Sequence, residues 1–373
     1  MFAKSLFNLS KNKILRNSNF QNNLFKSINR FNFNKVIMRK EYDTFGEIEV
    51  PEDKLWGAQT QRSLQNFEIG SVDDKMPLSV IRAMAIIKKC CAKVNMEYGL
   101  KADIGNAIIN SANEVIEGKY DNHFPLVIFQ TGSGTQTNMN VNEVLANRSS
   151  ELLGGQRGKD CLVNPNDHCN KGQSSNDTYP TAMHVSVAID LHKLLYPAIN
   201  ELKAAINKKV VDFKDIIKIG RTHTQDATPL TLGQEFSGYL QQIENHIKHL
   251  EYSSKYIYKL AQGGTAVGTG LNTTEGFDRN IAKVIADETG LPFETAENKF
   301  EALATKDALA NFHGTLNSLA TALYKISNDV KLLSGELKEL VISKESVDAC
   351  EEAMMNSVQV MGNHTAVTVG SKY

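Results

Sequence analysis

The residues best suited to chemistry lie in a polar segment, Gly220 to Phe236, in which His223 stands between two threonines. An imidazole can accept or donate a proton near neutral pH. The neighbouring Thr222 and Gln225 can hold a polar ligand. The same histidine could instead only hydrogen-bond its own loop, and these residues by themselves leave both interpretations open.

We expect a long helix to begin inside this segment. Thr228 has the side chain of a good N-cap, and Pro229 suits the first helical position. Apolar residues then recur three, four or seven positions apart, which predicts one buried face. They are Phe236, Leu240, Ile243, Ile247, Leu250 and Ile257. His223 would therefore lie at the mouth of a rigid helical bundle.

A second candidate site is a glycine-bearing polar loop that leads into another expected helix. Gly132 and Gly134 allow the backbone to approach a ligand closely. The hydroxyls of Ser133 and Thr135, with the free amides of a helix start, suit an anion. No Gly-Lys-Ser/Thr follows, and Thr137 replaces the third glycine of the dinucleotide fingerprint, so a nucleotide is disfavoured. A helix-entry loop without any ligand stays open as the alternative.

Long amphipathic helices must position these loops. Besides the helix after His223, the segments 185–210 and 309–333 carry apolar residues at helical spacing. Such stripes form the core of a helical bundle, so we assign them no ligand. A second glycine-rich loop, 263–272, lies between two of these helices and has no basic partner. We expect it to be a tight backbone crossing near the site.

The chain before the bundle predicts a smaller domain of mixed character. Alternating residues from Glu41 favour a short strand or hairpin, and helical patterns at about 77–98 and 102–117 each end at a glycine. A polar, Gly- and Asn-rich passage then separates this part from the bundle. We therefore expect a mainly α protein with an N-terminal domain of residues 41–173 and a helical bundle of residues 174–373.

Residues 1–40 differ in charge from the rest of the chain. They hold nine of the 41 Lys and Arg residues and none of the 42 Asp and Glu, which leaves 32 basic and 42 acidic residues beyond them. An acidic body disfavours nucleic acid as a partner. Apolar residues interleaved with basic residues and Asn are typical of a mitochondrial transit peptide, so we expect a mature matrix protein that begins near Glu41. A basic nucleic-acid-binding arm is the alternative.

Composition disfavours two other classes of protein. No apolar run approaches the length of about 18 residues that a membrane span needs, so we expect no membrane insertion. Five cysteines without a C-x-x-C pair favour a reducing compartment. The spacing of Cys161, His168 and Cys169 matches no zinc pattern, and we expect neither a metal nor a cofactor.

The polar loops together resemble the motifs of class II fumarate hydratases, of the aspartase/fumarase superfamily. The motifs are Gly132-Ser-Gly-Thr-Gln-Thr-Asn-Met-Asn, Gln173-Ser-Ser-Asn-Asp-Thr, Gly220-Arg-Thr-His-Thr-Gln-Asp-Ala and Gly264-Thr-Ala-Val-Gly-Thr-Gly-Leu-Asn. The resemblance runs from about Glu41 to about Val330. It implies the fumarase-like helical bundle and the reversible hydration of fumarate to (S)-malate without a cofactor. Aspartate ammonia-lyases usually have glutamine at the position of His223, so the histidine favours water addition.

The resemblance also implies roles for individual residues. His223 would act in acid and base chemistry, and Lys344 stands at the position of a lysine in the family's catalytic loop. The substrate carboxylates would be bound by Ser133, Gly134, Thr135, Ser174, Ser175, Asn176 and Thr222. A second anion site would fall on Asn164, Pro165, Asn166 and Asp167, where Asn164 replaces the usual histidine. The family assembles its site from three subunits of a homotetramer.

The C-terminal part departs from the family pattern, Gly-Ser-x-x-Met-x-x-Lys-x-Asn, whose mobile loop carries a serine base. Lys338 and Glu339 stand where serines are expected, and Ser346 replaces the asparagine. After Gly370 only three residues follow, so we expect the last core helix and the C-terminal domain to be absent. The alternative function is therefore a catalytically impaired paralogue that binds dicarboxylates or joins a complete subunit in a mixed tetramer. An aspartate ammonia-lyase is a third hypothesis.

Overall fold

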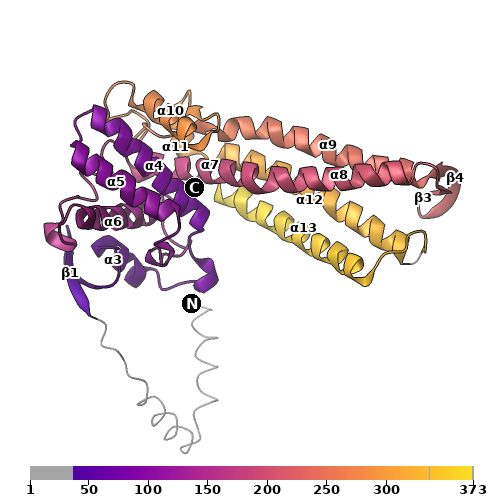
Figure 1. Ribbon diagram of the computed structural model, residues 1–373, viewed down its shortest axis with the longest axis horizontal. Coiled ribbons are helices and arrows are strands. Elements are labelled where there is room, and N and C mark those ends of the chain that lie inside the picture. The colour runs from indigo at the N-terminus through magenta and orange to yellow at the C-terminus, as the bar shows by residue number, and fades with distance from the viewer. Residues whose placement is uncertain (1–36, 336, 372–373) are drawn as a thin grey trace, which may run out of the picture.

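Long helices dominate the computed structural model, which describes residues 37–335 and 337–371 (Figure 1). They run from a head, formed mainly by the N-terminal part of the chain, to a small hairpin at the opposite end. Most of the predicted transit peptide, up to residue 36, lies outside the described residues. No helix among the residues described is long and apolar enough to cross a membrane.

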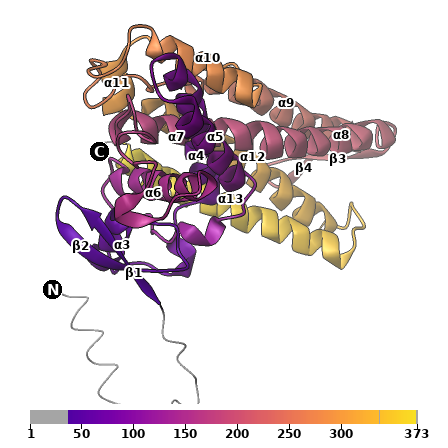
Figure 2. The same ribbon diagram turned by 60° about the vertical axis from the view of Figure 1, so that its left-hand side comes forward.

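The head combines a β-hairpin with four α-helices and short 3-10 turns that precede the bundle. Strand β1 (Met38–Asp43) pairs antiparallel with β2 (Gly46–Pro51) at the edge of the head (Figure 2). The helices are α3 (Ala58–Asn66), α4 (Leu78–Glu97), α5 (Ala102–Ile116) and α6 (Thr135–Leu152), with turns at Val72–Asp74 and Asp121–His123. The predicted hairpin and the helices predicted at 77–98 and 102–117 are thus confirmed. Ile87 of α4 and Ile108 of α5 are completely buried in the core.

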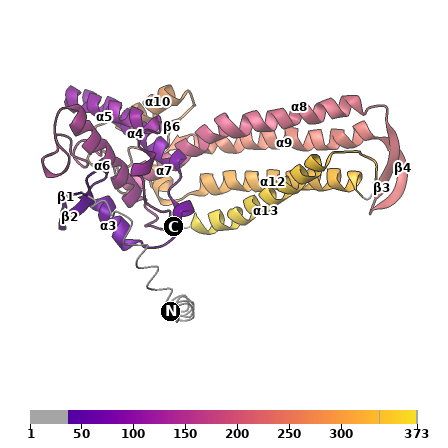
Figure 3. The same ribbon diagram turned by 60° about the horizontal axis from the view of Figure 1, so that its bottom comes forward.

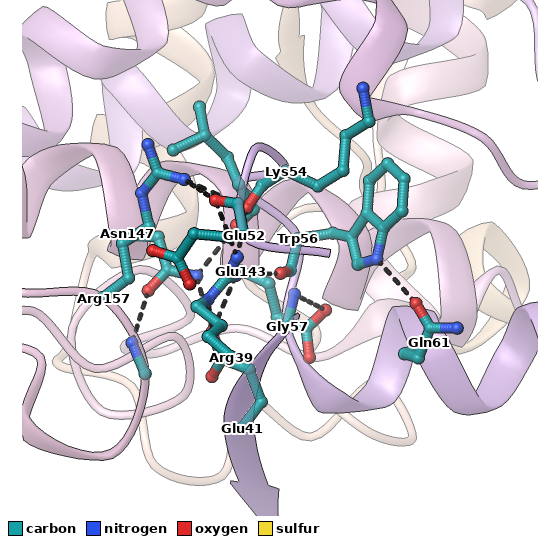
Figure 4. Close-up of polar contacts among 12 residues, drawn as sticks. Arg39, Glu41, Glu52, Lys54, Trp56, Gly57, Gln61, Glu143, Asn147 and Arg157 are labelled. Atoms are coloured by element: carbon teal, nitrogen blue, oxygen red, sulfur yellow. Dashed lines mark hydrogen bonds and ion pairs between the residues drawn. The ribbon is translucent and has the colours of Figure 1, made fainter. Parts of the chain in front are cut away.

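A buried carboxylate joins α6 to the start of α3. Glu143 accepts hydrogen bonds from the backbone amides of Gly57 at 2.9 Å (Figure 4), Gln59 at 2.7 Å and Thr60 at 3.1 Å. These amides have no partner inside α3 because they belong to its first turn. A carboxylate also stabilises the positive end of a helix dipole. Glu143 therefore fixes the orientation of α3 in the head.

Arg39 shows that the folded chain begins before Glu41. Its guanidinium donates to the backbone oxygens of Pro51 at 2.9 Å, and of Lys54 and Trp56 at 2.6 Å (Figure 4). It also donates to the Glu41 carboxylate at 2.9 Å. The expected start of the N-terminal domain at Glu41 is corrected accordingly, since the three preceding residues belong to β1.

An almost unbroken helical rod leads from the head to the far end of the molecule (Figure 3). It consists of α7 (Ser175–Asp190), a π-helical turn (Leu191–Leu195) and α8 (Tyr196–Asp212). At the far end the chain forms a hairpin of β3 (Ile217–Thr222) and β4 (Gln225–Thr231), and α9 (Leu232–Ile257) returns toward the head. The rod begins at Ser175, so the predicted bundle boundary at residue 174 coincides with a helix start.

Helix α9 begins three residues later than the sequence suggested. Thr231 is its N-cap and accepts the amide of Gln234 at 3.1 Å, while the Gln234 side chain accepts the amide of Thr231 at 2.9 Å. Such a reciprocal cap needs Glu, Gln or Asp three residues after the cap. Thr228 cannot form such a cap, because the residue three positions after it is Thr231. Pro229 does not begin the helix but lies in β4 opposite Ile219.

Two long antiparallel helices complete the bundle. The remaining elements are a 3-10 turn (Gly158–Asp160), β5 (Lys259–Leu260), α10 (Phe277–Thr289), β6 (Glu294–Thr295), α11 (Lys299–Ala304), α12 (Asp307–Ser334) and α13 (Lys344–Gly370). Helix α12 confirms the stripe predicted at 309–333, and α13 returns along it toward the head (Figure 1). Helix α13 was not predicted from the sequence. Within α13 only Ser357 is buried, whereas Met355 and Val358 are 65 % and 56 % exposed.

Candidate active site

Two helix starts in the head bring three of the predicted substrate-binding hydroxyls together. Thr135 opens α6, and Ser175 opens α7. The Oγ1 atom of Thr135 lies 2.9 Å from Oγ of Ser175 and 3.1 Å from Oγ of Ser133. Segments forty residues apart in sequence thus share one chain of hydrogen-bonded hydroxyls. The chain is open to solvent at Ser133 and Thr135, so a ligand can replace one of its internal bonds.

Gly134 allows α6 to start this close to α7. It adopts a left-handed conformation with φ of 70° as the N-cap of α6. A Cβ atom there would lie 2.1 Å from the ring of Tyr179, a side chain of α7. Both the backbone angle and the contact therefore require glycine. The role of Gly134 is to permit the approach of the two helix starts.

The remaining head residues of the predicted site also lie at the start of α7. Ser174 is its N-cap, and its Oγ accepts the amide of Asn176 at 3.2 Å. The Asn176 side-chain amide donates to the backbone oxygen of Ala266 at 2.8 Å. The glycine-rich loop 263–272 therefore crosses beside α7, as the sequence suggested. Both residues, like Ser175, are only partly buried.

The electrostatics of this cluster suit a small anion. The N-terminal ends of α6 and α7 each carry a partial positive charge and amides that the helix itself does not use. Hydroxyl and side-chain amide donors surround them. In the part of the chain that the structure describes, no group of three His, Cys, Asp or Glu residues is placed to hold a metal ion. Hydrogen-bond donors and helix ends are therefore the chemistry that this cluster offers.

His223 and Thr222 lie in the hairpin at the other end of the bundle. His223 and Thr224 have φ angles of 50° and 62°, which form the tight turn between β3 and β4. Both His223 and Thr222 are exposed. The rod from Ser175 to Asp212 spans roughly 57 Å at 1.5 Å per residue. A single chain therefore does not unite the histidine with the hydroxyls of the head.

Lys344 is the first residue of α13 and is exposed. The connection before it packs on the hairpin, because the Glu339 carboxylate pairs with Lys218 and Arg221 of β3. Burial would raise the pKa of Glu339, but the hydrogen bonds from these two cations outweigh it and lower that pKa. A cavity of about 690 Å³ lies beside this contact and is lined by Arg221, Thr222 and Leu337, among others.

The predicted second anion site forms a tight turn. The Asn164 side-chain oxygen accepts the amides of Asn166 at 2.8 Å and Asp167 at 3.0 Å, across Pro165. Asn164, which stands where the family usually has histidine, therefore uses its side-chain oxygen to stabilise the turn that it begins. His168 accepts the Asn164 amide at 2.9 Å and stabilises the same turn. An anion role for these four residues stays a prediction.

Asp177 is a residue at this site that the sequence analysis missed. Its Oδ1 accepts the amide of Ser174 at 2.9 Å, and its Oδ2 accepts the amides of Gly263 at 3.0 Å and Thr265 at 2.9 Å. Burial raises the pKa of Asp177 to about 6, against the effect of these hydrogen bonds. The Ser-x-x-Asp spacing of a capping box was the available signal. Its second partner, the 263–265 segment, has no local signal in the sequence.

Lys88 is a second missed residue, and it contacts the segment that leads into α7. It is completely buried in α4, and its Nζ donates to the side-chain oxygens of Asn170 at 2.8 Å and Gln173 at 2.9 Å. Burial lowers the pKa of Lys88 to about 8. The only sign of Lys88 in the sequence was its position among the apolar residues of a predicted helix. Lys88 supports the segment that leads into Ser174.

Comparisons with known proteins identify the family of this chain. A family model described as a lyase matches residues 46–347. The mitochondrial fumarate hydratase 1 of Arabidopsis thaliana is 57 % identical over 89 % of this chain and 70 % of that protein. The human mitochondrial fumarate hydratase is 54 % identical over 89 % of this chain and 68 % of its own length. The chain belongs to the fumarate hydratase family.

A solved structure supports the same membership. The class II fumarase from Schistosoma mansoni matches with a TM-score of 0.86 and 41 % sequence identity, over 90 % of this chain and 76 % of that one. The mainly α, fumarase-like bundle is thus confirmed, and so are the recognition of the family and the hydro-lyase class. These comparisons do not favour the alternatives, an impaired paralogue and an aspartate ammonia-lyase. The predicted mitochondrial location agrees with the names of both relatives, which place them in mitochondria.

Proposed function

We propose that the protein catalyses the reversible addition of water to fumarate, which gives (S)-malate. In this reaction the oxygen of water bonds to one alkene carbon, and a proton adds to the other. The observation that carries the proposal is the hydroxyl chain of Ser133, Thr135 and Ser175 at two adjacent helix starts. Hydroxyls and free amides there bind one carboxylate of the substrate, with Ser174 and Asn176 beside them. Thr222 contributes from the hairpin.

The same donors explain how the reaction is accelerated. Negative charge builds up on one carboxylate when the carbon bonded to it loses a proton, or, in the direction of hydration, when hydroxide adds to the other alkene carbon. Fixed donors aimed at that charge stabilise the transition state more than the ground state. His223 transfers the proton through a water molecule, since an imidazole nitrogen can either donate or accept one. Lys344 adds a positive charge at the same end of the bundle.

The complete site needs more than one copy of the chain. His223 lies far from the head in its own chain, so a hairpin from a second copy must reach the head hydroxyls. Exposed apolar residues of the long helices support such assembly: Leu332, Met355 and Val358 are 37 %, 65 % and 56 % exposed. Large apolar surfaces mark interfaces in soluble proteins. We therefore propose a homotetramer, or a mixed tetramer with a complete subunit.

The contact of Glu339 favours one second candidate, a subunit that binds dicarboxylates without turnover. Glu339 stands where the family loop has serine, and its carboxylate is already paired with Lys218 and Arg221. An ion-paired carboxylate with a lowered pKa is a poor proton acceptor. If no other group replaces the serine base, turnover falls by about 10² to 10⁴.

The decisive experiment measures both properties on one preparation. The loss of fumarate absorbance reports turnover, and calorimetric titration with fumarate reports binding. Turnover with binding supports the hydratase, whereas binding without turnover supports the second candidate. The absence of both would refute both proposals. Ammonia release from aspartate is measured in parallel, and any substantial release would contradict the role given to His223.

A further inference from the structure

The loop 263–272 is held in a conformation that it does not prefer. Thr265 has a φ of 56°, which is unfavourable for a residue with a side chain. Gly263 has a φ of 93°, and a Cβ there would lie 2.5 Å from the Asp278 side chain. Strained backbone persists only when its surroundings fix it. The hydrogen bonds from both amides to Asp177 provide that restraint.

We propose that Asp177 is a positioning residue that orients the donors of the dicarboxylate site. Its carboxylate bonds Gly263 and Thr265 to the start of α7, and so places the backbone oxygen of Ala266. That oxygen accepts the side-chain amide of Asn176 at 2.8 Å and fixes its direction. Asp177 is completely buried, so it acts through these groups and does not touch the ligand. The inference rests on the proposed function, since it takes the ligand to be fumarate.

The charges around Asp177 leave the backbone amides as its principal partners. Lys88 of α4 faces it, but its Nζ donates to Asn170 and Gln173. Lys299 of α11 also faces it, but donates to the backbone oxygen of Leu260 at 2.8 Å. Both cations favour the ionised carboxylate without bonding to it. At neutral pH Asp177 is therefore a charged acceptor for three amide donors.

Asp177→Asn is the sharpest variant because it preserves the volume of the side chain. One oxygen becomes an NH₂ group, which meets an amide donor instead of accepting from it. The loop and the Asn176 amide should then lose their fixed arrangement. Asp190→Asn is the matched control, since Asp190 lies in the same helix and makes no such bonds. Asp177→Ser keeps a capping oxygen and serves if the Asn variant does not fold.

The test measures fumarate binding by calorimetry between pH 5.5 and 7.5, with unfolding temperature and amide exchange of the 263–266 segment. We expect Asp177→Asn to weaken binding about tenfold to a hundredfold at neutral pH, the effect of losing a charged hydrogen bond. Exchange in 263–266 should be faster. Wild-type binding should weaken as the pH falls through about 6. The variant should lack that dependence, and Asp190→Asn should behave like wild type.

The outcomes separate this inference from the proposed function. Equal fumarate affinity in a folded Asp177→Asn variant and the wild type would overturn the inference alone. Failure of both Asp177 variants to fold would assign Asp177 to stability of the head and overturn it too. A wild-type protein that does not bind fumarate would refute the proposed function, and the positioning role with it. Weaker binding in the Asn variant, with an unchanged Asp190→Asn control, supports the inference.

Discussion

The two ends of the molecule hold parts of one proposed site but are built in opposite ways. In the head, charged groups such as Glu143, Asp177 and Lys88 are buried and hydrogen-bonded, and they fix the loops that carry the donors. At the hairpin end, His223 and Thr222 are exposed on a tight turn. The head is therefore organised within a single chain. The hairpin presents exposed groups whose proposed role requires a second surface.

This difference predicts that changes at the hairpin alter function with little effect on stability, whereas changes to the buried charged groups of the head alter stability as well. A buried charge that loses its partner is costly, because water cannot replace that partner. An exposed residue in a turn contributes little to folding. The four predictions below test the contrast, from the largest expected effect to the smallest.

The hairpin prediction concerns His223→Asn. Asparagine tolerates the left-handed conformation that the turn requires, so the fold should be retained. Turnover should fall by about 10² to 10⁴, the usual contribution of an acid or base group. Fumarate hydration and thermal unfolding are measured together. Thr224→Asn, at the neighbouring left-handed position, is the control and should stay active. A folded His223→Asn variant with unchanged turnover would remove the histidine from the mechanism.

The head prediction concerns Arg39→Ala. The variant leaves the Glu41 carboxylate and three backbone oxygens without their cation in a nearly buried environment. The free energy of unfolding should fall by about 3 kcal/mol, as for other buried ion pairs that lose one partner. Denaturant unfolding measures this loss, with the exposed Lys40→Ala as the control.

The mature protein should also start at or before Ile37, as N-terminal sequencing would show. A start at Glu41 in a stable protein would contradict this role of Arg39.

The sequence predicted more of the head than of its connections. Glycine stops and helical periodicity located α4 and α5, and the polar motifs located the starts of α6 and α7, because these signals are local. The bonds from Asp177 to Gly263 and Thr265 join segments more than eighty residues apart, so no local pattern announced them.

At the hairpin end the local sequence allowed two starting points for α9. Both Thr228 and Thr231 are acceptable caps, and the pairing of β3 with β4 decided for the second. The separation of His223 from the head hydroxyls depends on the length of the rod, which periodicity shows only after the helix bounds are known. The predicted roles of the site residues, including Lys344, therefore remain to be tested by function.

A third prediction uses the pH dependence of Glu143 in the head. Burial raises its pKa to about 6 in the folded protein, although the bonds from the start of α3 lower it. In the unfolded chain its pKa is about 4.3. The folded state thus binds the proton more tightly, so this stabilising contribution is complete below the unfolded pKa and is lost as the pH rises to about 6. The loss amounts to roughly 2 kcal/mol.

Glu143→Gln should remove this slope. The variant will be less stable at neutral pH, because its NH₂ group meets amide donors. Its free energy of unfolding should nevertheless change less between pH 4.5 and 6.5 than that of the wild type. Denaturant unfolding at several pH values makes the comparison. Parallel curves for the two proteins would show that Glu143 binds protons equally in the folded and unfolded states.

The smallest effect is expected at the start of α9, where the hairpin meets the bundle. Thr231→Ala removes the oxygen that accepts the Gln234 amide, and an N-cap of this kind contributes about 1 kcal/mol. Thr228→Ala is the matched control, because Thr228 lies in β4 and caps no helix. Denaturant unfolding should show the loss only for Thr231→Ala, with turnover preserved in both. A larger loss for Thr228→Ala would place the helix start where the sequence first suggested it. A large loss of turnover in Thr231→Ala would show that the hairpin depends on the cap to hold His223, and the separation of stability from function at this end would fail.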